Sequence, residues 1–123
     1  MNRTVLIVDD DLLLRNTLAQ LLAIEGYCVL TADSFEAGRS VLHESSPDIL
    51  IVDIRLGVFN GLQLIATAPR GIPSIVMTGH DDVTLKRAAY QFGAEYLVKP
   101  IPSELLLASV RRQLSDTALR DSR

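Results

Sequence analysis

Runs of apolar residues recur along the chain and alternate with segments in which apolar residues repeat at helical spacing. The runs at residues 5–8 and 49–52 are uninterrupted, and further candidate strands lie at 27–32, 72–77 and 95–98. An apolar run without polar alternation is typical of a strand that is covered on both faces, as in the centre of a parallel sheet. The pattern therefore predicts five strands.

The segments between the strands have the spacing of amphipathic helices. Leu14, Leu18 and Leu22 share one face of the first segment. We expect Asp11 to cap its N-terminus and Gly26 to end it. Further helices are predicted at residues 34–45, around 62–65, at 81–92, where Asp81 or Asp82 can cap the N-terminus, and at 102–114.

Five strands thus alternate with five helices, and the connections are too short for anything other than crossovers. Because such crossovers join parallel strands and are right-handed, we expect an α/β fold with one five-stranded parallel sheet and helices on both faces. A chain of 123 residues suffices for one domain with a full core.

Composition excludes several classes of protein. The net charge of -3 argues against a chain that binds nucleic acid directly through its phosphates. Neither a membrane-spanning segment nor a signal peptide is apparent, so we expect a cytoplasmic protein without a membrane partner. Cys28 is the single cysteine, which excludes an internal disulfide and a cysteine-based metal site, and we expect it to be a small buried hydrophobe.

Polar residues follow four of the predicted strands. They are Asp9 with Asp10, Asp53, Thr78 and Lys99. Because parallel strands end at the same edge of a sheet, we expect these side chains to converge there. Three crowded carboxylates need a cation, and oxygen ligands favour Mg2+. With a lysine and a hydroxyl added, the group has what a phosphoryl group bound to one carboxylate would need.

These positions resemble the receiver domain of a two-component response regulator. The residues Val8–Asp10, the strand-ending Asp53, Met77–Gly79 and Lys99–Pro100 follow the family's order and approximate spacing over residues 3–114. The resemblance implies a doubly wound, flavodoxin-like (βα)5 fold with strand order 2-1-3-4-5. We expect a receiver domain at residues 1–114 and a C-terminal tail or the start of a linker at 115–123.

The resemblance also assigns roles to residues. Asp53 would accept a phosphoryl group from a sensor histidine kinase or a histidine phosphotransfer protein. Asp10 would hold Mg2+ together with Asp53 and the backbone carbonyl of Arg55, and Asp9 would assist directly or through water. Lys99 would pair with Asp53 or with the phosphoryl oxygens. The protein would be a phosphoacceptor switch, with self-catalysed phosphotransfer and slow autodephosphorylation at most.

The same resemblance implies a switch and a regulator of its lifetime. Thr78 would move toward the phosphoryl group and Tyr96 would turn inward, which would bias the face formed by residues 81–112 and could support a homodimer. Tyr96 could also be ordinary core. We hypothesise that the side chains of Arg55 and His80 shade the aspartyl phosphate, the alternative being that both point to solvent.

The loop after Asp53 departs from the family's usual sequence. The family commonly has Pro-Gly where this chain has Gly57-Val58, which predicts a loop of the usual length but different stiffness.

Three other functions are possible for a chain with this pattern. A Mg2+-dependent phosphatase would need a second acid close behind Asp53, where Arg55 stands. A flavodoxin-like cofactor binder would need a phosphate-binding loop after the first strand. A receiver that binds partners without being phosphorylated would not need all these residues.

Overall fold

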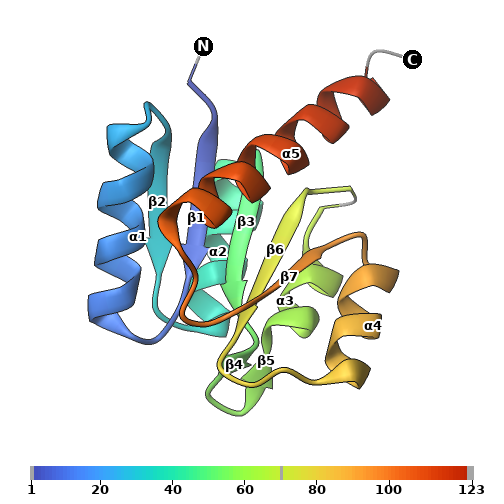
Figure 1. Ribbon diagram of the computed structural model, residues 1–123. Helices are drawn as coiled ribbons and strands as arrows, with labels where there is room; N and C mark the ends of the chain where they lie inside the picture. The colour runs from blue at the N-terminus through green and yellow to red at the C-terminus, as the bar shows by residue number, and fades with distance from the viewer. Residues whose placement is uncertain (1, 70, 122–123) are drawn as a thin grey trace.

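The computed structural model describes residues 2–69 and 71–121, with side chains to residue 115 (Figure 1). Its elements are β1 (Thr4–Val8), α1 (Leu12–Ile24), β2 (Cys28–Ala32), α2 (Phe35–Ser45), β3 (Ile49–Asp53), β4 (Arg55–Leu56), β5 (Phe59–Asn60), α3 (Gly61–Thr67), β6 (Ser74–Thr78), α4 (Val83–Gln91), β7 (Glu95–Val98) and α5 (Ser103–Asp121). Within this part of the chain no helix is both long and apolar enough to cross a membrane.

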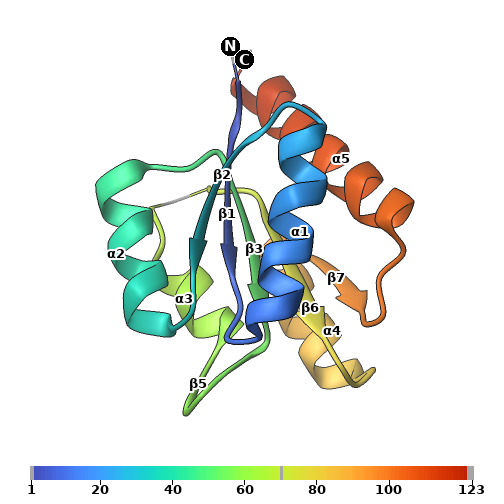
Figure 2. The same cartoon turned by 90° about the vertical axis from the view of Figure 1, so that its left-hand side faces the viewer.

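The main sheet confirms the expected topology. Its strand order is β2-β1-β3-β6-β7, and every neighbouring pair is parallel. This is the predicted order 2-1-3-4-5 when the five long strands are counted alone. Helices α1 and α5 cover one face, and α2, α3 and α4 cover the other (Figure 2).

Alternate side chains of the central strands enter two separate cores. Val5 and Ile7 pack with α1 and α5, whereas Leu6 and Val8 pack with the helices on the opposite face. Because both faces are covered, every residue of β3 is buried. The uninterrupted apolar run at 49–52 is thus explained, as predicted, by a strand that is covered on both faces.

Most helix starts follow from side-chain caps. Asp11 caps α1 as expected, by accepting a hydrogen bond from the Leu14 N–H at 3.2 Å. Ser34 caps α2. Of the two candidates before α4, Asp82 is the cap, since its side chain accepts from two backbone N–H groups.

The structure adds a hairpin that the sequence pattern did not predict. Strands β4 and β5 form a two-stranded antiparallel sheet directly after Asp53, where only a loop was expected. Their two-residue turn is Gly57-Val58, and Gly57 has a φ of +64°. A glycine with positive φ at the first turn position suits a tight hairpin, so the departure from Pro-Gly has a structural use here.

The prediction that Cys28 is buried was wrong: its side chain is exposed. Cys28 is the first residue of β2, and β2 is an edge strand with a neighbour on one side only. Helix α5 continues to Asp121 and passes without a break through residue 115, where a tail was expected to start.

Gly61 generates a test of how closely α3 approaches the strand that ends in Asp53. A Cβ added at Gly61 would lie 2.6 Å from the Asp53 carbonyl oxygen, so Gly61→Ala must displace backbone. We expect a loss of roughly 1–3 kcal/mol of unfolding free energy in urea. Gly79→Ala is the control, because a Cβ there meets no atom within 4 Å. Equal stability of the two variants would contradict this account.

Candidate functional site

The polar residues that follow the strands do meet at one edge of the sheet. Asp9 and Asp10 follow β1, Asp53 ends β3, Thr78 ends β6 and Lys99 follows β7. All four strands are parallel, so their carboxyl ends point the same way. The structure therefore brings together residues that lie up to 90 positions apart in sequence.

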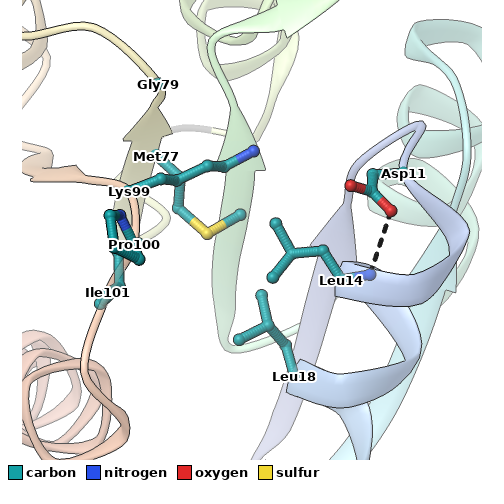
Figure 3. Close-up of a pocket in the computed structure, with 8 residues that line it drawn as sticks. All are labelled: Asp11, Leu14, Leu18, Met77, Gly79, Lys99, Pro100 and Ile101. Carbon is teal, nitrogen blue, oxygen red and sulfur yellow. Dashed lines mark hydrogen bonds between the residues drawn. The ribbon is translucent and has the colours of Figure 1, made fainter.

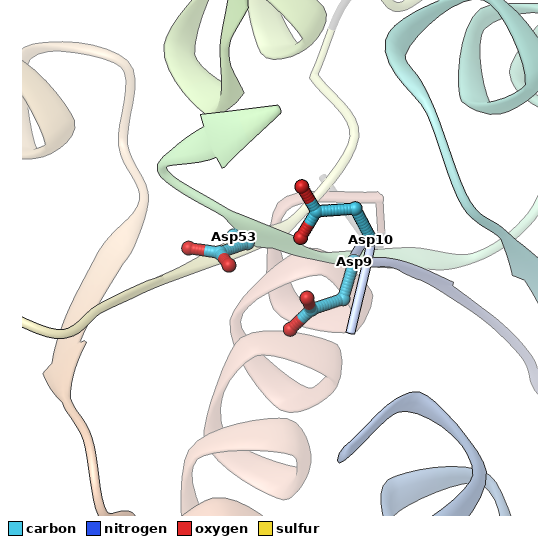
Figure 4. A group of neighbouring side chains, drawn as sticks. All are labelled: Asp9, Asp10 and Asp53. Carbon is cyan, nitrogen blue, oxygen red and sulfur yellow. The ribbon is translucent and has the colours of Figure 1, made fainter. Parts of the chain in front are cut away.

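Three carboxylates form the centre of the site. Asp9, Asp10 and Asp53 each offer an oxygen within 4.8 Å of the others, and Figure 4 shows the three side chains gathered at the ends of β1 and β3. Asp9 is fully buried, Asp53 is 7% exposed, and Asp10 is exposed to solvent. One side of the cluster is thus held in the protein while the other remains open to a ligand.

Lys99 supplies the positive charge that this edge needs. Its Nζ lies 3.0 Å from Asp53 Oδ2 and 3.4 Å from Asp9 Oδ2. Burial alone would lower the pKa of Lys99, but hydrogen bonds and charge attraction from Asp53, and then Asp9, outweigh it and raise the pKa above 10.5. Lys99 is therefore charged throughout the physiological pH range.

Asp9 accepts hydrogen bonds through both its carboxylate and its backbone carbonyl. Its Oδ1 accepts from the Asp11 N–H at 2.9 Å, and its backbone carbonyl accepts from Arg15 Nη1 at 2.8 Å. Burial raises the pKa of Asp9, and the negative charge of Asp53 adds to this, while the Asp11 N–H and Lys99 oppose it. Arg15 was not expected at the site from sequence, and its spacing four residues after the Asp11 cap is the signal that could have found it.

Thr78 and Tyr96 share one hydrogen-bond acceptor. The Thr78 hydroxyl donates to the His80 carbonyl at 3.0 Å, and the Tyr96 hydroxyl donates to the same carbonyl at 3.1 Å. Tyr96 also accepts from the N–H of Asp82, the cap of α4, at 2.8 Å. The two side chains are therefore linked through the β6–α4 loop.

Cavities border the site on several sides. One of about 450 Å³ lies between α1 and the segment after β7, and Figure 3 shows Lys99 beside it with Leu14 and Ile101. Another, of about 280 Å³, is lined by Asp10 and the turn of the hairpin. A second cavity beside the hairpin, of about 290 Å³, lies between it and the β6–α4 loop. Arg55, His80 and Thr78 all line this second cavity, so the two candidate lifetime residues border the same space.

The donor set fits a hard divalent cation. Carboxylate oxygens are the ligands that Mg2+ prefers, and no histidine or cysteine is among the three grouped side chains. Arg55 lies next to the group, because its N–H donates to Asp53 Oδ1 at 3.3 Å. The residues present could therefore hold Mg2+, which would offset the repulsion among the acids.

The raised pKa of Asp9 predicts that its charge costs stability without a cation. The folded protein favours the protonated form, so this contribution to stability is present below the unfolded pKa of 3.8 and is lost as pH rises through the raised folded value. Asp9→Asn should thus melt a few degrees above wild type near neutral pH in EDTA, and the gain should vanish below pH 3.8. Thermal unfolding followed by circular dichroism measures this.

Asp48→Asn is the matched control, because Asp48 lies at the opposite end of the sheet, where its carboxylate accepts from the Thr4 N–H. It should not raise the melting temperature. A loss of stability in Asp9→Asn near neutral pH would contradict the predicted sign.

Sequence comparison places the chain among known regulators. The family model described as the response regulator receiver domain matches residues 5–111. The chain is 38% identical over 114 residues to the C4-dicarboxylate transport transcriptional regulatory protein DctD of Pseudomonas aeruginosa, covering 89% of this chain and 25% of DctD. It is 38% identical over 118 residues to the DNA-binding transcriptional regulator NtrC of Escherichia coli, covering 90% and 24%. The chain thus spans about a quarter of the length of these relatives.

Solved structures agree with the sequence comparison. A CheY-like response regulator receiver domain protein from Methanospirillum hungatei superposes with a TM-score of 0.92 at 26% identity, covering 98% of this chain and 99% of that one. A response regulator receiver domain protein from Clostridium thermocellum superposes with a TM-score of 0.87 at 28% identity, covering 95% and 98%. With the acid cluster and Lys99 at the expected edge of the sheet, the chain belongs to the receiver-domain family of response regulators.

Proposed function

We propose that Asp53 accepts a phosphoryl group from a phosphohistidine on a sensor histidine kinase or a histidine phosphotransfer protein, in a Mg2+-dependent reaction. The observation that carries this proposal is the position of Asp53, with Lys99 3.0 Å away and two further carboxylates grouped beside it. A receiver domain serves generally as a phosphoacceptor, and these residues supply what that role requires at one carboxylate.

The transfer needs one nucleophile and a neutralised phosphoryl group. A carboxylate oxygen of Asp53 attacks phosphorus, the new O–P bond forms, and the N–P bond of the donor histidine breaks. The electron pair returns to the imidazole, which takes up a proton. Lys99 turns its ammonium from the Asp53 carboxylate to the phosphoryl oxygens. Its charge thus offsets the carboxylate before transfer and the phosphoryl group after it.

Asp10, Asp53 and the Arg55 backbone carbonyl are the residues that would hold Mg2+, with Asp9 acting directly or through water. When bound, Mg2+ supplies positive charge to the phosphoryl oxygens. Asp9 is the most buried of the three acids, and its carboxylate accepts from the Asp11 N–H and pairs with Lys99, which suits a supporting role. Asp10 is exposed, which suits a ligand that exchanges with solvent.

The switch would begin with the acceptor that Thr78 and Tyr96 share. When the Thr78 hydroxyl turns to a phosphoryl oxygen, the His80 carbonyl loses one of its two donors. The β6–α4 loop can then rearrange, and Tyr96 can leave the α4 cap and turn inward. This shift between two packings would alter the position of α4.

The face formed by residues 81–112 is the proposed output surface for a partner, an attached domain or a second copy of the chain. Five large apolar side chains are exposed over it. They are Val83, Tyr90, Phe92, Val98 and Leu105. The chain spans a quarter of regulators such as NtrC, whose name describes DNA binding, so we propose that this segment controls an output without itself binding DNA.

The surface at the start of α1, beside Lys99, suits the protein that donates the phosphoryl group. Leu12 and Leu13 are exposed at the start of α1, next to the cavity between α1 and Ile101. An apolar rim beside the acceptor carboxylate can hold a helical partner while its histidine reaches Asp53.

The other functions fit the site less well. A phosphatase would need an acid near Asp53 for protonation of the leaving group, and Arg55 stands at the relevant position. A flavin phosphate would meet Asp9, Asp10 and Asp11 after β1, which would repel it. A receiver that only binds partners would have no use for the Lys99–Asp53 contact.

Incubation with acetyl phosphate and Mg2+ tests the phosphoacceptor. We expect intact-protein mass spectrometry to show one phosphoryl group, stable in acid and labile in base, that is absent in Asp53→Asn or after addition of EDTA. Asp48→Asn is the control, since this acid precedes the same strand at its far end and should leave labelling unchanged. Labelling of Asp53→Asn at the wild-type level would refute the proposal.

The lifetime of the phosphoprotein tests Arg55 and His80. Both line the cavity outside Thr78, so we propose that they limit the access of water to the phosphoryl group. Arg55→Ala and His80→Ala should each lose phosphate severalfold faster after the donor is removed. His43→Ala, on the exposed surface of α2, should decay at the wild-type rate. An unchanged half-life in both site variants would mean that these side chains only face solvent.

A further inference from the structure

The register of the hairpin β4–β5 decides which of its residue pairs exchange backbone hydrogen bonds. Leu56 lies opposite Phe59 beside the turn, and Arg55 lies opposite Asn60. One step further, Gly61 donates its N–H to the carbonyl of the residue before β4 at 2.9 Å. Bonded and non-bonded pairs alternate along an antiparallel ladder, so Arg55 and Asn60 form the non-hydrogen-bonded pair.

The backbone polar groups of this pair therefore point away from the hairpin. The Asn60 N–H donates to Gln63 Oε1 at 2.7 Å, and the Arg55 N–H donates to Asp53 Oδ1 at 3.3 Å. In an extended strand the N–H and the C=O of one residue point to the same side. The register thus turns the Arg55 carbonyl toward the side on which Asp53 and the acid cluster lie.

Packing on α2 holds the hairpin in this orientation. The ring of Phe59 stacks on the ring of Phe35, with centroids 4.3 Å apart and planes inclined by 18°. Phe35 is buried as the first residue of α2, so it gives the hairpin a fixed support. The turn itself adds little, because Val58 is 94% exposed and Gly57 is conformationally permissive.

We propose that Phe59 is a positioning residue for cation binding: its stack on Phe35 holds the hairpin so that the Arg55 carbonyl faces the carboxylates. The ring touches neither the cation nor the phosphoryl group. The ring acts on Arg55 through the two paired positions of the hairpin. The stack thereby makes the loop rigid, which the turn sequence Gly57-Val58 alone would not do. The proposal rests on the Mg2+ site of the proposed function.

Titration with MgCl2 measures the effect without any phosphoryl transfer. Amide resonances of Asp10 and Asp53, followed by NMR, give the Kd of the wild type and of Phe59→Ala. Loss of one aromatic pair should raise this Kd about three- to tenfold. Phe59→Tyr, which keeps a ring that can stack, should restore the wild-type value, and Phe35→Leu should reproduce the loss.

A metal-free measurement tests the same support. Without the stack, the hairpin should open more often, and the Gly61 N–H, which donates across its base, should exchange with solvent faster in Phe59→Ala. Unchanged exchange of this amide would overturn the proposal whatever the Kd. If Phe59→Ala does not fold, Phe59→Leu takes its place, because it keeps apolar volume and removes only the ring.

Two controls separate positioning from general weakening. Val58→Ala changes the neighbouring, solvent-exposed side chain and should leave the Kd unchanged. Ile49→Val removes a methylene group from the core between the sheet and helices α1 and α5, away from the hairpin, and so lowers the stability of the fold. This variant should also leave the Kd for Mg2+ unchanged. An equal rise in Ile49→Val, or no rise in Phe59→Ala, would overturn the proposal. A wild type that binds no Mg2+ would instead overturn the metal site of the proposed function, and this proposal with it.

Discussion

The balance between one lysine and a group of carboxylates is the constraint on which the site depends. Asp9 and Asp53 are both buried at the end of the sheet, where two negative charges repel strongly. Lys99 lies within 3.4 Å of both and is the cation that makes this arrangement tolerable in the described structure. The pKa of Asp9 is nevertheless raised, chiefly because its carboxylate is buried and also because Asp53 is close. Three carboxylates beside one lysine leave an excess of negative charge, which suits the site to bind a cation.

Much of this arrangement could be predicted because parallel strands impose it. The apolar runs at 49–52 and 5–8 identified the buried strands, and the acids that follow them had to lie at one edge. The caps Asp11 and Asp82 also followed from local rules. Contacts that depend on three-dimensional packing did not. The exposure of Cys28 depends on its place at the sheet edge, and Arg15 reaches Asp9 only through the geometry of the first turn of α1.

The β4–β5 hairpin escaped prediction for a different reason. Its strands are two residues long, too short for any periodicity to register, and its turn lacks the usual Asn-Gly or Asp-Gly signal. What defines it is long-range: the ring of Phe59 stacks on Phe35, which belongs to α2. The loop that departs most from the family pattern is therefore also the one whose order depends on a contact 24 residues away in the chain (59 − 35).

The Lys99–Asp9 pair also joins the end of the first strand of the sheet to the end of the last. The two residues are 90 positions apart, and β7, the strand that delivers Lys99, is the last strand of the sheet. A chain that ends before residue 99 has these acids but lacks the lysine that offsets their charge. During folding, the charge balance of the cluster is therefore completed only when β7 joins the edge of the sheet.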